Sequence, residues 1–125
     1  MTASTVVMVG ARALIAMLFI LAGVAKILGP APVLEHMAAF RVPGFFLPLV
    51  IALEIGAGLA LLIGWRITWA AGALALFCVI AAFVFHLDFA NRAERTLFFK
   101  DLAIAGGLLA LALNAMRHDA LARLR

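Results

Sequence analysis

Four long apolar stretches set the pattern of the chain, at residues 6–28, 45–64, 67–87 and 97–115. Each stretch has about 20 residues and would form a helix about 30 Å long, which matches the hydrocarbon thickness of a bilayer. None shows the period-two alternation of a membrane strand, and a helix satisfies its own backbone hydrogen bonds, as lipid requires. The pattern predicts an all-α integral membrane protein, a bundle of four transmembrane helices.

The segment between the first two spans has a helical pattern of its own. Its apolar residues fall on one helical face, opposite Glu35 and His36: Val33, Leu34, Met37 and Phe40. Pro32 suits the first turn of a helix, where its missing N–H is not needed. We therefore predict a short amphipathic interfacial helix over residues 32–41, with an irregular loop as the alternative.

The whole chain, residues 1–125, is expected to form a single membrane domain. The connection between the second and third spans is so short that it predicts a tight antiparallel hairpin, with Trp65 and Arg66 at the membrane interface. Four spans place both termini on one side, and the distribution of Lys and Arg slightly favours a cytoplasmic location for them. The basic tail, residues 116–125, is expected to associate with the membrane surface.

Composition narrows the class of protein further. Hydrophobic residues make up 68% of the chain and charged residues 13%, against about half and a quarter in soluble domains. This excess excludes a soluble enzyme and a disordered chain. The net charge is +4, but the basic residues sit singly at the ends of apolar runs, so we expect no nucleic-acid binding. Cys78 is the only cysteine; it cannot form an intrachain disulfide and is expected to be a small buried residue.

Glu54 is the most informative polar residue, because it lies near the middle of the second span. A carboxylate at that depth costs several kcal/mol unless it is neutralised, paired or hydrated. We therefore expect Glu54 to face the interior of the bundle, a water-filled cavity or a partner.

The first span carries two cations, Arg12 and Lys26, on the same helical face as Gly23. Gly23 would let another helix approach closely, although both cations could instead extend outward to the membrane surface. Small residues recur every fourth position on the second and fourth spans, which favours close helix contacts. The glycines assigned to helix packing are Gly23, Gly56, Gly64 and Gly107.

The predicted topology brings Lys26, His86, Lys100 and Asp101 to one membrane level. With Glu54, these residues form either a closed network that fixes helix packing, a pocket for an anionic or quinone-like headgroup, or a proton path. We favour the closed network. The candidate intramembrane polar residues are therefore Arg12, Lys26, Glu54, His86, Lys100 and Asp101.

No established catalytic or nucleotide-binding motif occurs in the sequence. His86 has no second His or Cys at the spacing of a metal ligand, so we expect no metal site. We assign no catalytic residue and no cofactor, apart from the quinone alternative.

The ordered polar positions resemble those of the DoxX family of small four-helix membrane proteins. The resemblance covers about residues 8–113. It rests on five pieces: Arg12-x6-Phe19-x3-Gly23-x2-Lys26, Met37-Ala-Ala-Phe-Arg-Val-Pro43, Glu54 with Gly58 and Gly64, His86, and Phe99-Lys-Asp-Leu-Ala-Ile-Ala-Gly-Gly107.

The resemblance implies a multi-pass protein of the bacterial inner membrane. Some relatives are linked to redox systems, among them the small membrane subunit of thiosulfate:quinone oxidoreductase and a membrane partner of superoxide dismutase and a thiol-metabolising enzyme. Asp101 stands where the family more often has Asn, and this added carboxylate favours the closed network over an anion pocket. The absence of a cysteine pair argues against a direct sulfur-redox role.

Three functions are compatible with this sequence. The first is a non-catalytic membrane subunit or scaffold associated with a redox system, whose partners are lipid, other membrane or membrane-docked proteins, or further copies of the chain. The second is a quinone-linked oxidoreductase subunit with a headgroup near Glu54, Lys26, His86 and Lys100. The third is a small transporter, ranked last because no inverted repeat is evident.

Overall fold

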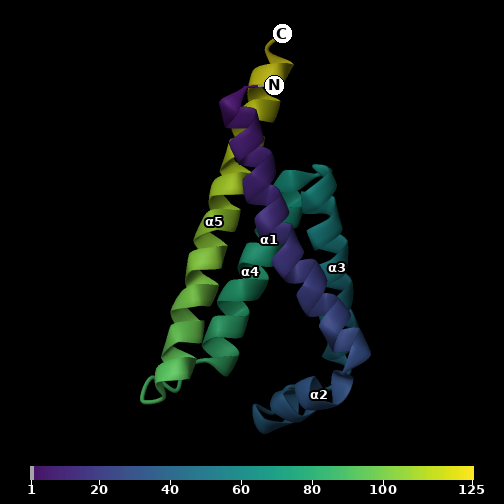
Figure 1. Cartoon of the computed structure of the whole chain (residues 1–125), viewed down its shortest axis with the longest axis vertical. Helices are drawn as coiled ribbons and strands as arrows, with labels where there is room; N and C mark the ends of the chain where they lie inside the picture. The colour runs from purple at the N-terminus through teal and green to yellow at the C-terminus, as the bar shows by residue number, and fades with distance from the viewer. Residues whose placement is uncertain (1) are drawn as a thin grey trace. The chain divides into compact units, whose positions relative to one another are not determined.

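The computed structural model describes residues 2–125 and contains five helices in that range (Figure 1). They are α1 (Ala3–Leu28), α2 (Pro30–Ala39), α3 (Phe46–Ile63), α4 (Ile67–Phe85) and α5 (Arg92–Arg123). All except α2 are long and apolar enough to cross a membrane. The predicted all-α fold with four spans and a short helix after the first span is confirmed.

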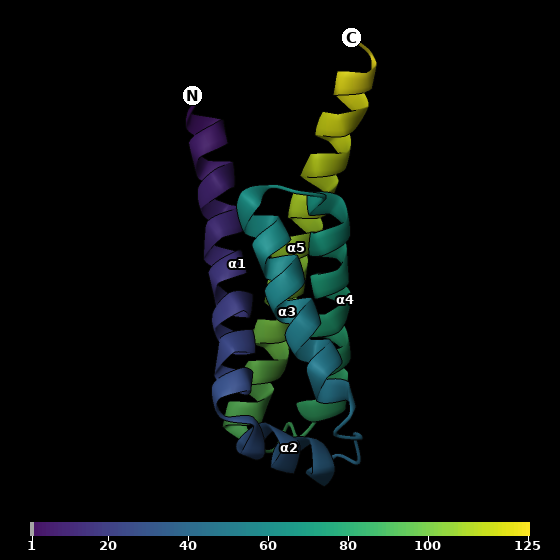
Figure 2. The same cartoon turned by 90° about the vertical axis from the view of Figure 1, so that its right-hand side faces the viewer.

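The helices belong to two compact units, an N-terminal unit (Met1–Trp65) and a C-terminal unit (Arg66–Arg125). In the N-terminal unit α1 and α3 pack as an antiparallel pair, and α2 runs crosswise at the end where α1 finishes (Figures 1 and 2). Pro30 lies in the first turn of α2, where proline is favoured. The loop alternative for this segment is therefore wrong, whereas the contact of α2 with the membrane surface stays a prediction.

The end of α3 is set by Gly64, whose φ of 82° lies in the left-handed region that favours glycine. The backbone N–H groups of Gly64 and Trp65 both donate to the carbonyl of Ala60. These bonds satisfy a carbonyl that the helix itself leaves without a partner and stop the helix there. The predicted tight turn between the second and third spans thus has a defined backbone cause.

In the C-terminal unit α4 and α5 lie side by side in both views and run in opposite directions (Figures 1 and 2). Small residues on α4 let the helices approach: Ala71 and Ala82 are fully buried, together with Leu74 and, from α5, Leu108. Cys78 is buried on the same helix. The buried face is therefore built from alanine and leucine on both helices.

Helix α5 is longer than the apolar run that predicted it. It begins at Arg92, capped by the Asn91 side chain, and continues to Arg123, whereas the apolar run covers only residues 97–115. Much of the basic tail is thus helical. Its association with the membrane surface stays a prediction, as does the description of the whole chain as a single domain.

Much of the apolar surface is not covered by the protein itself. Between 17% and 33% of the most apolar window of each span is buried. Large apolar side chains such as Leu14, Leu49 and Leu76 are more than half exposed. Surfaces of this kind suit contact with lipid or with other helices and are unsuited to water.

Candidate intramembrane polar sites

The N-terminal unit holds a buried ion pair between α1 and α3. Lys26 Nζ lies 2.7 Å from Glu54 Oε1, and the Glu54 side chain is 3% exposed. Lys26 is in the last turn of α1, where a cation is also favoured by the helix dipole. A carboxylate so deep in an apolar helix requires a compensating charge. Lys26 provides it and ties the end of α1 to the middle of α3.

Gly23 brings the two helices close enough for this pair to form. A Cβ at Gly23 would lie 2.5 Å from Ile55 Cγ1 and 3.5 Å from Glu54 Cβ. Since contacts under 3.0 Å essentially do not occur for real Cβ atoms, any larger residue would push Ile55 aside. Gly23 is one turn from Lys26 on the same face of α1, so the close approach and the ion pair are adjacent.

Arg12 lies at the other end of the same helix pair and has a different role. Its Nη1 donates a 3.1 Å hydrogen bond to the carbonyl of Leu61, in the last turn of α3. A cation at a helix C-terminus satisfies an orphan carbonyl and is favoured by the helix dipole. A Cβ on Gly64 would lie 2.6 Å from this Arg12 nitrogen. Glycine at the turn is thus required by φ, and a side chain there would also displace the Arg12 guanidinium.

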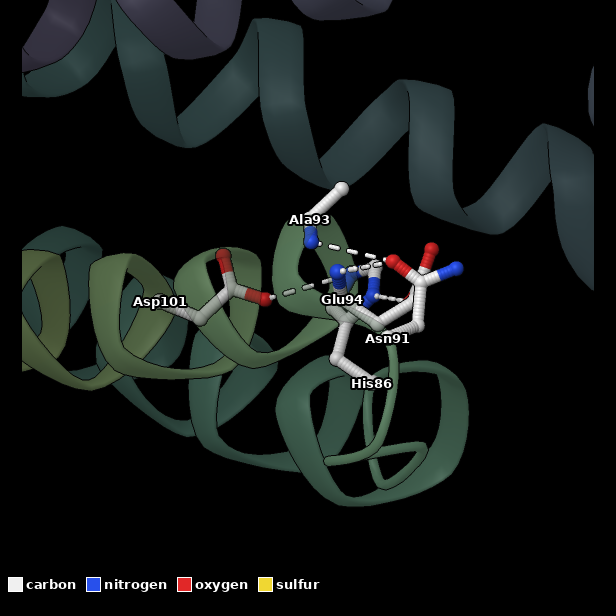
Figure 3. Close-up of polar contacts among 5 residues, drawn as sticks. All are labelled: His86, Asn91, Ala93, Glu94 and Asp101. Atoms are coloured by element: carbon white, nitrogen blue, oxygen red, sulfur yellow. Dashed lines mark hydrogen bonds and ion pairs between the residues drawn. The ribbon is translucent and has the colours of Figure 1, made fainter.

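The C-terminal unit holds a second polar site, the His86 group, made of His86, Glu94 and Asp101 (Figure 3). His86 Nδ1 lies 2.6 Å from Glu94 Oε2, and Nε2 lies 3.7 Å from Asp101 Oδ2. Glu94 and Asp101 are seven residues apart and share one face of α5. The imidazole, which follows the end of α4, therefore lies between two carboxylates.

With Glu94 ionised, the contact between the two side chains assigns the donor nitrogen of the His86 ring. An ionised carboxylate only accepts hydrogen bonds, so Nδ1 is the donor to Glu94. The Nε2 contact with Asp101 is longer than a hydrogen bond. The side chains of His86, Glu94 and Asp101 are 16%, 27% and 25% exposed, so this group, unlike Glu54, is open to its surroundings.

Glu94 is the site residue that the sequence analysis missed. Asn91 Oδ1 accepts from the N–H groups of Ala93 and Glu94, and Asn-x-x-Glu resembles a capping box. In that motif the Glu side chain returns to the N-cap N–H. Here the N–H of Asn91 donates to the carbonyl of Asp88, and the Glu94 carboxylate turns to His86 instead. The i, i+7 spacing from Asp101 was a signal that could have found it.

Aromatic rings surround the same end of the C-terminal unit. Phe98 makes edge-to-face contacts with Phe83 and Phe89, with ring centroids 5.2 and 5.0 Å apart. Phe98 follows Glu94 by one turn of α5, and Phe83 precedes His86 by one turn of α4. The His86 group is therefore flanked along the chain by a packed aromatic cluster.

The predicted polar residues thus fall into separate contacts. Lys26 pairs with Glu54, His86 contacts Asp101, Arg12 caps α3, and Lys100 is exposed. That one cluster unites these groups stays a prediction. Within residues 2–125, no group of three or more His, Cys, Asp or Glu side chains is arranged to hold a metal ion.

The predicted packing glycines also differ in their surroundings. A Cβ on Gly56 would meet nothing within 4 Å, whereas one on Gly58 would lie 2.9 Å from Ile20 Cγ1. Gly58, which was part of the family resemblance but not of the packing set, therefore lies at the α1–α3 contact. The packing roles assigned to Gly56 and Gly107 stay predictions.

Comparison with known proteins agrees with this architecture. The DoxX family profile matches residues 7–87. The Escherichia coli K12 protein named "Inner membrane protein YqjF" is 47% identical over 104 residues, which cover 83% of this chain and 80% of the relative. No solved structure gives a significant match. With four apolar helices, these matches establish the chain as a multi-pass inner membrane protein that belongs to the DoxX family.

Proposed function

We propose that this chain is a non-catalytic membrane subunit or scaffold associated with a redox system. The Lys26–Glu54 ion pair carries the proposal. A mid-membrane carboxylate used in chemistry has to meet substrate or water, whereas Glu54 is 3% exposed and lies 2.7 Å from its cation. Both charges are used to hold α1 against α3. The link to a redox system rests on the family resemblance alone.

The other intramembrane contact of this unit supports the same role. Arg12 is held by the Leu61 carbonyl and so completes the end of α3. The exposed apolar side chains of the spans offer surface to lipid or to a partner helix. A scaffold needs rigid helices and an apolar exterior, and the N-terminal unit supplies both.

Purification at native expression tests the proposal. The full chain, tagged and expressed from its own promoter, is extracted in mild detergent and its partners are quantified. We expect a stoichiometric membrane or membrane-docked redox protein to co-purify. The double variant Lys26→Met/Glu54→Leu, which replaces the ion pair by apolar side chains, is expected to keep that partner. A chain that purifies alone contradicts the proposal, as does a folded double variant that no longer co-purifies with the partner.

The His86 group supports a second candidate, the membrane subunit of a quinone-linked oxidoreductase. A neutral His86 ring would accept a hydrogen bond from a quinol hydroxyl at Nε2, and a protonated ring would donate one to a quinone carbonyl. The nearby Phe89 and Phe98 rings suit a flat apolar ligand. Two carboxylates beside one imidazole disfavour an anionic headgroup, so this candidate is restricted to quinones.

A binding assay separates the two candidates. A short-chain quinone is titrated into the purified full chain, and binding is compared for wild type, His86→Ala and His118→Ala. His118 lies in the exposed last part of α5 and serves as the matched control. Loss of binding in His86→Ala alone supports the quinone-linked candidate. Equal binding in all three proteins, or none in the wild type, rejects it.

A further inference from the structure

An open groove of about 490 Å³ lies in the C-terminal unit, between the start of α4 and the last turns of α5. From α4 it is lined by Arg66 and Trp69, and from α5 by Met116, Asp119 and Arg123. The three α5 residues follow one another at intervals of one turn along a single face. None of them belongs to the Lys26–Glu54 pair or to the His86 group.

The groove lies where α5 leaves its apolar run. That run ends at residue 115, and Figure 2 shows α5 continuing past the level at which α4 begins. Helix α4 starts at Ile67, directly after Arg66. Trp69 is 76% exposed in the first turn of α4, and tryptophan is enriched at the level of lipid headgroups. The groove therefore lies at the level predicted for lipid phosphates.

The lining of the groove changes from charged to apolar along α5, from Arg123 to Met116. Arg123 and Arg66 supply guanidinium groups, which bind phosphate oxygens in a bidentate manner. Met116 lies two turns deeper along α5 than Arg123 and is 54% exposed. A ligand that matches this order has a phosphate at one end and hydrocarbon next to it.

We propose that this groove binds an anionic phospholipid, with its phosphate at Arg66 and Arg123 and its acyl chains beside Met116. Trp69 lies alongside the glycerol region of the lipid. A lipid bound there contacts both the start of α4 and the end of α5. These two segments lie at the opposite end of the helix pair from the His86 group. The proposal is independent of whether the protein is a scaffold or a quinone-linked subunit.

Asp119 predicts an effect on lipid retention opposite to that of the arginines. Asp119 also lines the groove and precedes Arg123 by one turn of α5, so its negative charge repels a phosphate placed there. Removing this negative charge should strengthen lipid retention, whereas removing either arginine should weaken it. If these residues had only a structural role, the Asp119 and arginine substitutions would not change lipid retention in opposite directions.

Native mass spectrometry of the purified full chain measures the retained lipid. The protein is equilibrated with equal amounts of phosphatidylglycerol and phosphatidylcholine in mild detergent. We expect the anionic lipid to be retained preferentially, and Arg66→Gln and Arg123→Gln each to lower its retention about tenfold, the effect of losing one hydrogen bond to a charged group. Asp119→Asn should raise retention. Arg117→Gln, on the same helix but outside the groove lining, is the matched control and should change nothing.

A second measurement locates the lipid and does not depend on mass spectrometry. The chain has two tryptophans, so Trp65→Phe leaves Trp69 as the only reporter. Phosphatidylglycerol brominated on its acyl chains should quench Trp69 fluorescence more than brominated phosphatidylcholine, and Arg123→Lys should preserve this difference. Circular dichroism and gel filtration establish that each variant is folded.

Three results would overturn the proposal. Equal retention of the two lipids would remove the preference for an anionic headgroup. An equal loss in Arg117→Gln and Arg123→Gln would mean general attraction to the basic end of α5. Displacement of the lipid by millimolar inorganic phosphate, with no change in Trp69 quenching between brominated lipids, would make a free phosphate the ligand.

Discussion

The Lys26–Glu54 pair and the His86 group both place ionisable side chains on apolar helices, but their charges are matched differently. Glu54 is buried and meets one cation at 2.7 Å. His86 lies between two carboxylates, at 2.6 and 3.7 Å, and all three side chains are partly exposed. In the first arrangement one cation faces one carboxylate, whereas in the second one imidazole faces two carboxylates. Any chemistry of this protein is therefore more plausible at His86 than at Glu54.

The largest loss of stability is expected when one partner of the Lys26–Glu54 ion pair is removed. Lys26→Met leaves the Glu54 carboxylate buried without its cation and should destabilise the protein by about 3–5 kcal/mol. The double variant Lys26→Met/Glu54→Leu should recover most of that loss, because apolar replacements of a buried ion pair are often tolerated. Unfolding of the purified protein in a detergent titration measures both. Lys100→Met, at an exposed lysine, is the control. A double variant no more stable than the single one would contradict a structural role.

A smaller loss of stability is expected from overpacking the contact between α1 and α3. Gly23→Ala places a methyl group 2.5 Å from Ile55 Cγ1, and the overpacking should cost about 1–3 kcal/mol. Gly56→Ala meets nothing within 4 Å and should be neutral or stabilise the helix by up to about 1 kcal/mol. The same unfolding titration compares them. Equal destabilisation would show that Gly56 also lies in a contact, outside those of the N-terminal unit.

The sequence was sufficient for the helices, because they follow from the cost of unsatisfied polar groups in lipid. It also indicated that Glu54 needs pairing, neutralisation or hydration, but it left Lys26 as one of several polar residues at one membrane level and did not choose the partner. The contacts of Arg12 and Glu94 could not be predicted in the same way. Arg12 binds a backbone carbonyl, which no side-chain pattern reveals. Glu94 depends on the direction taken by one side chain at a helix N-terminus, where capping and pairing with His86 compete.

The two carboxylates of the His86 group can be ranked against each other. Glu94→Gln removes the charged acceptor 2.6 Å from Nδ1 and should cost about 1 kcal/mol, less than is usual for a hydrogen bond to a charged group because the site is partly exposed. Nitrogen NMR of the imidazole should also show less of the form protonated at Nδ1. If the population of that form is unchanged, Glu94 does not determine the state of the ring.

The smallest effect is expected for Asp101→Asn. Asp101 Oδ2 is 3.7 Å from Nε2, beyond hydrogen-bond distance, so the loss of its charge should change stability by less than about 0.5 kcal/mol. The form of His86 protonated at Nδ1 should persist, because Glu94 still accepts the hydrogen bond from Nδ1. The same NMR signals and unfolding titration test this expectation. A loss equal to that of Glu94→Gln would mean that both carboxylates hold the ring equally. The His86 group would then be as closed as the Lys26–Glu54 pair, and the argument for quinone binding at Nε2 would fail with it.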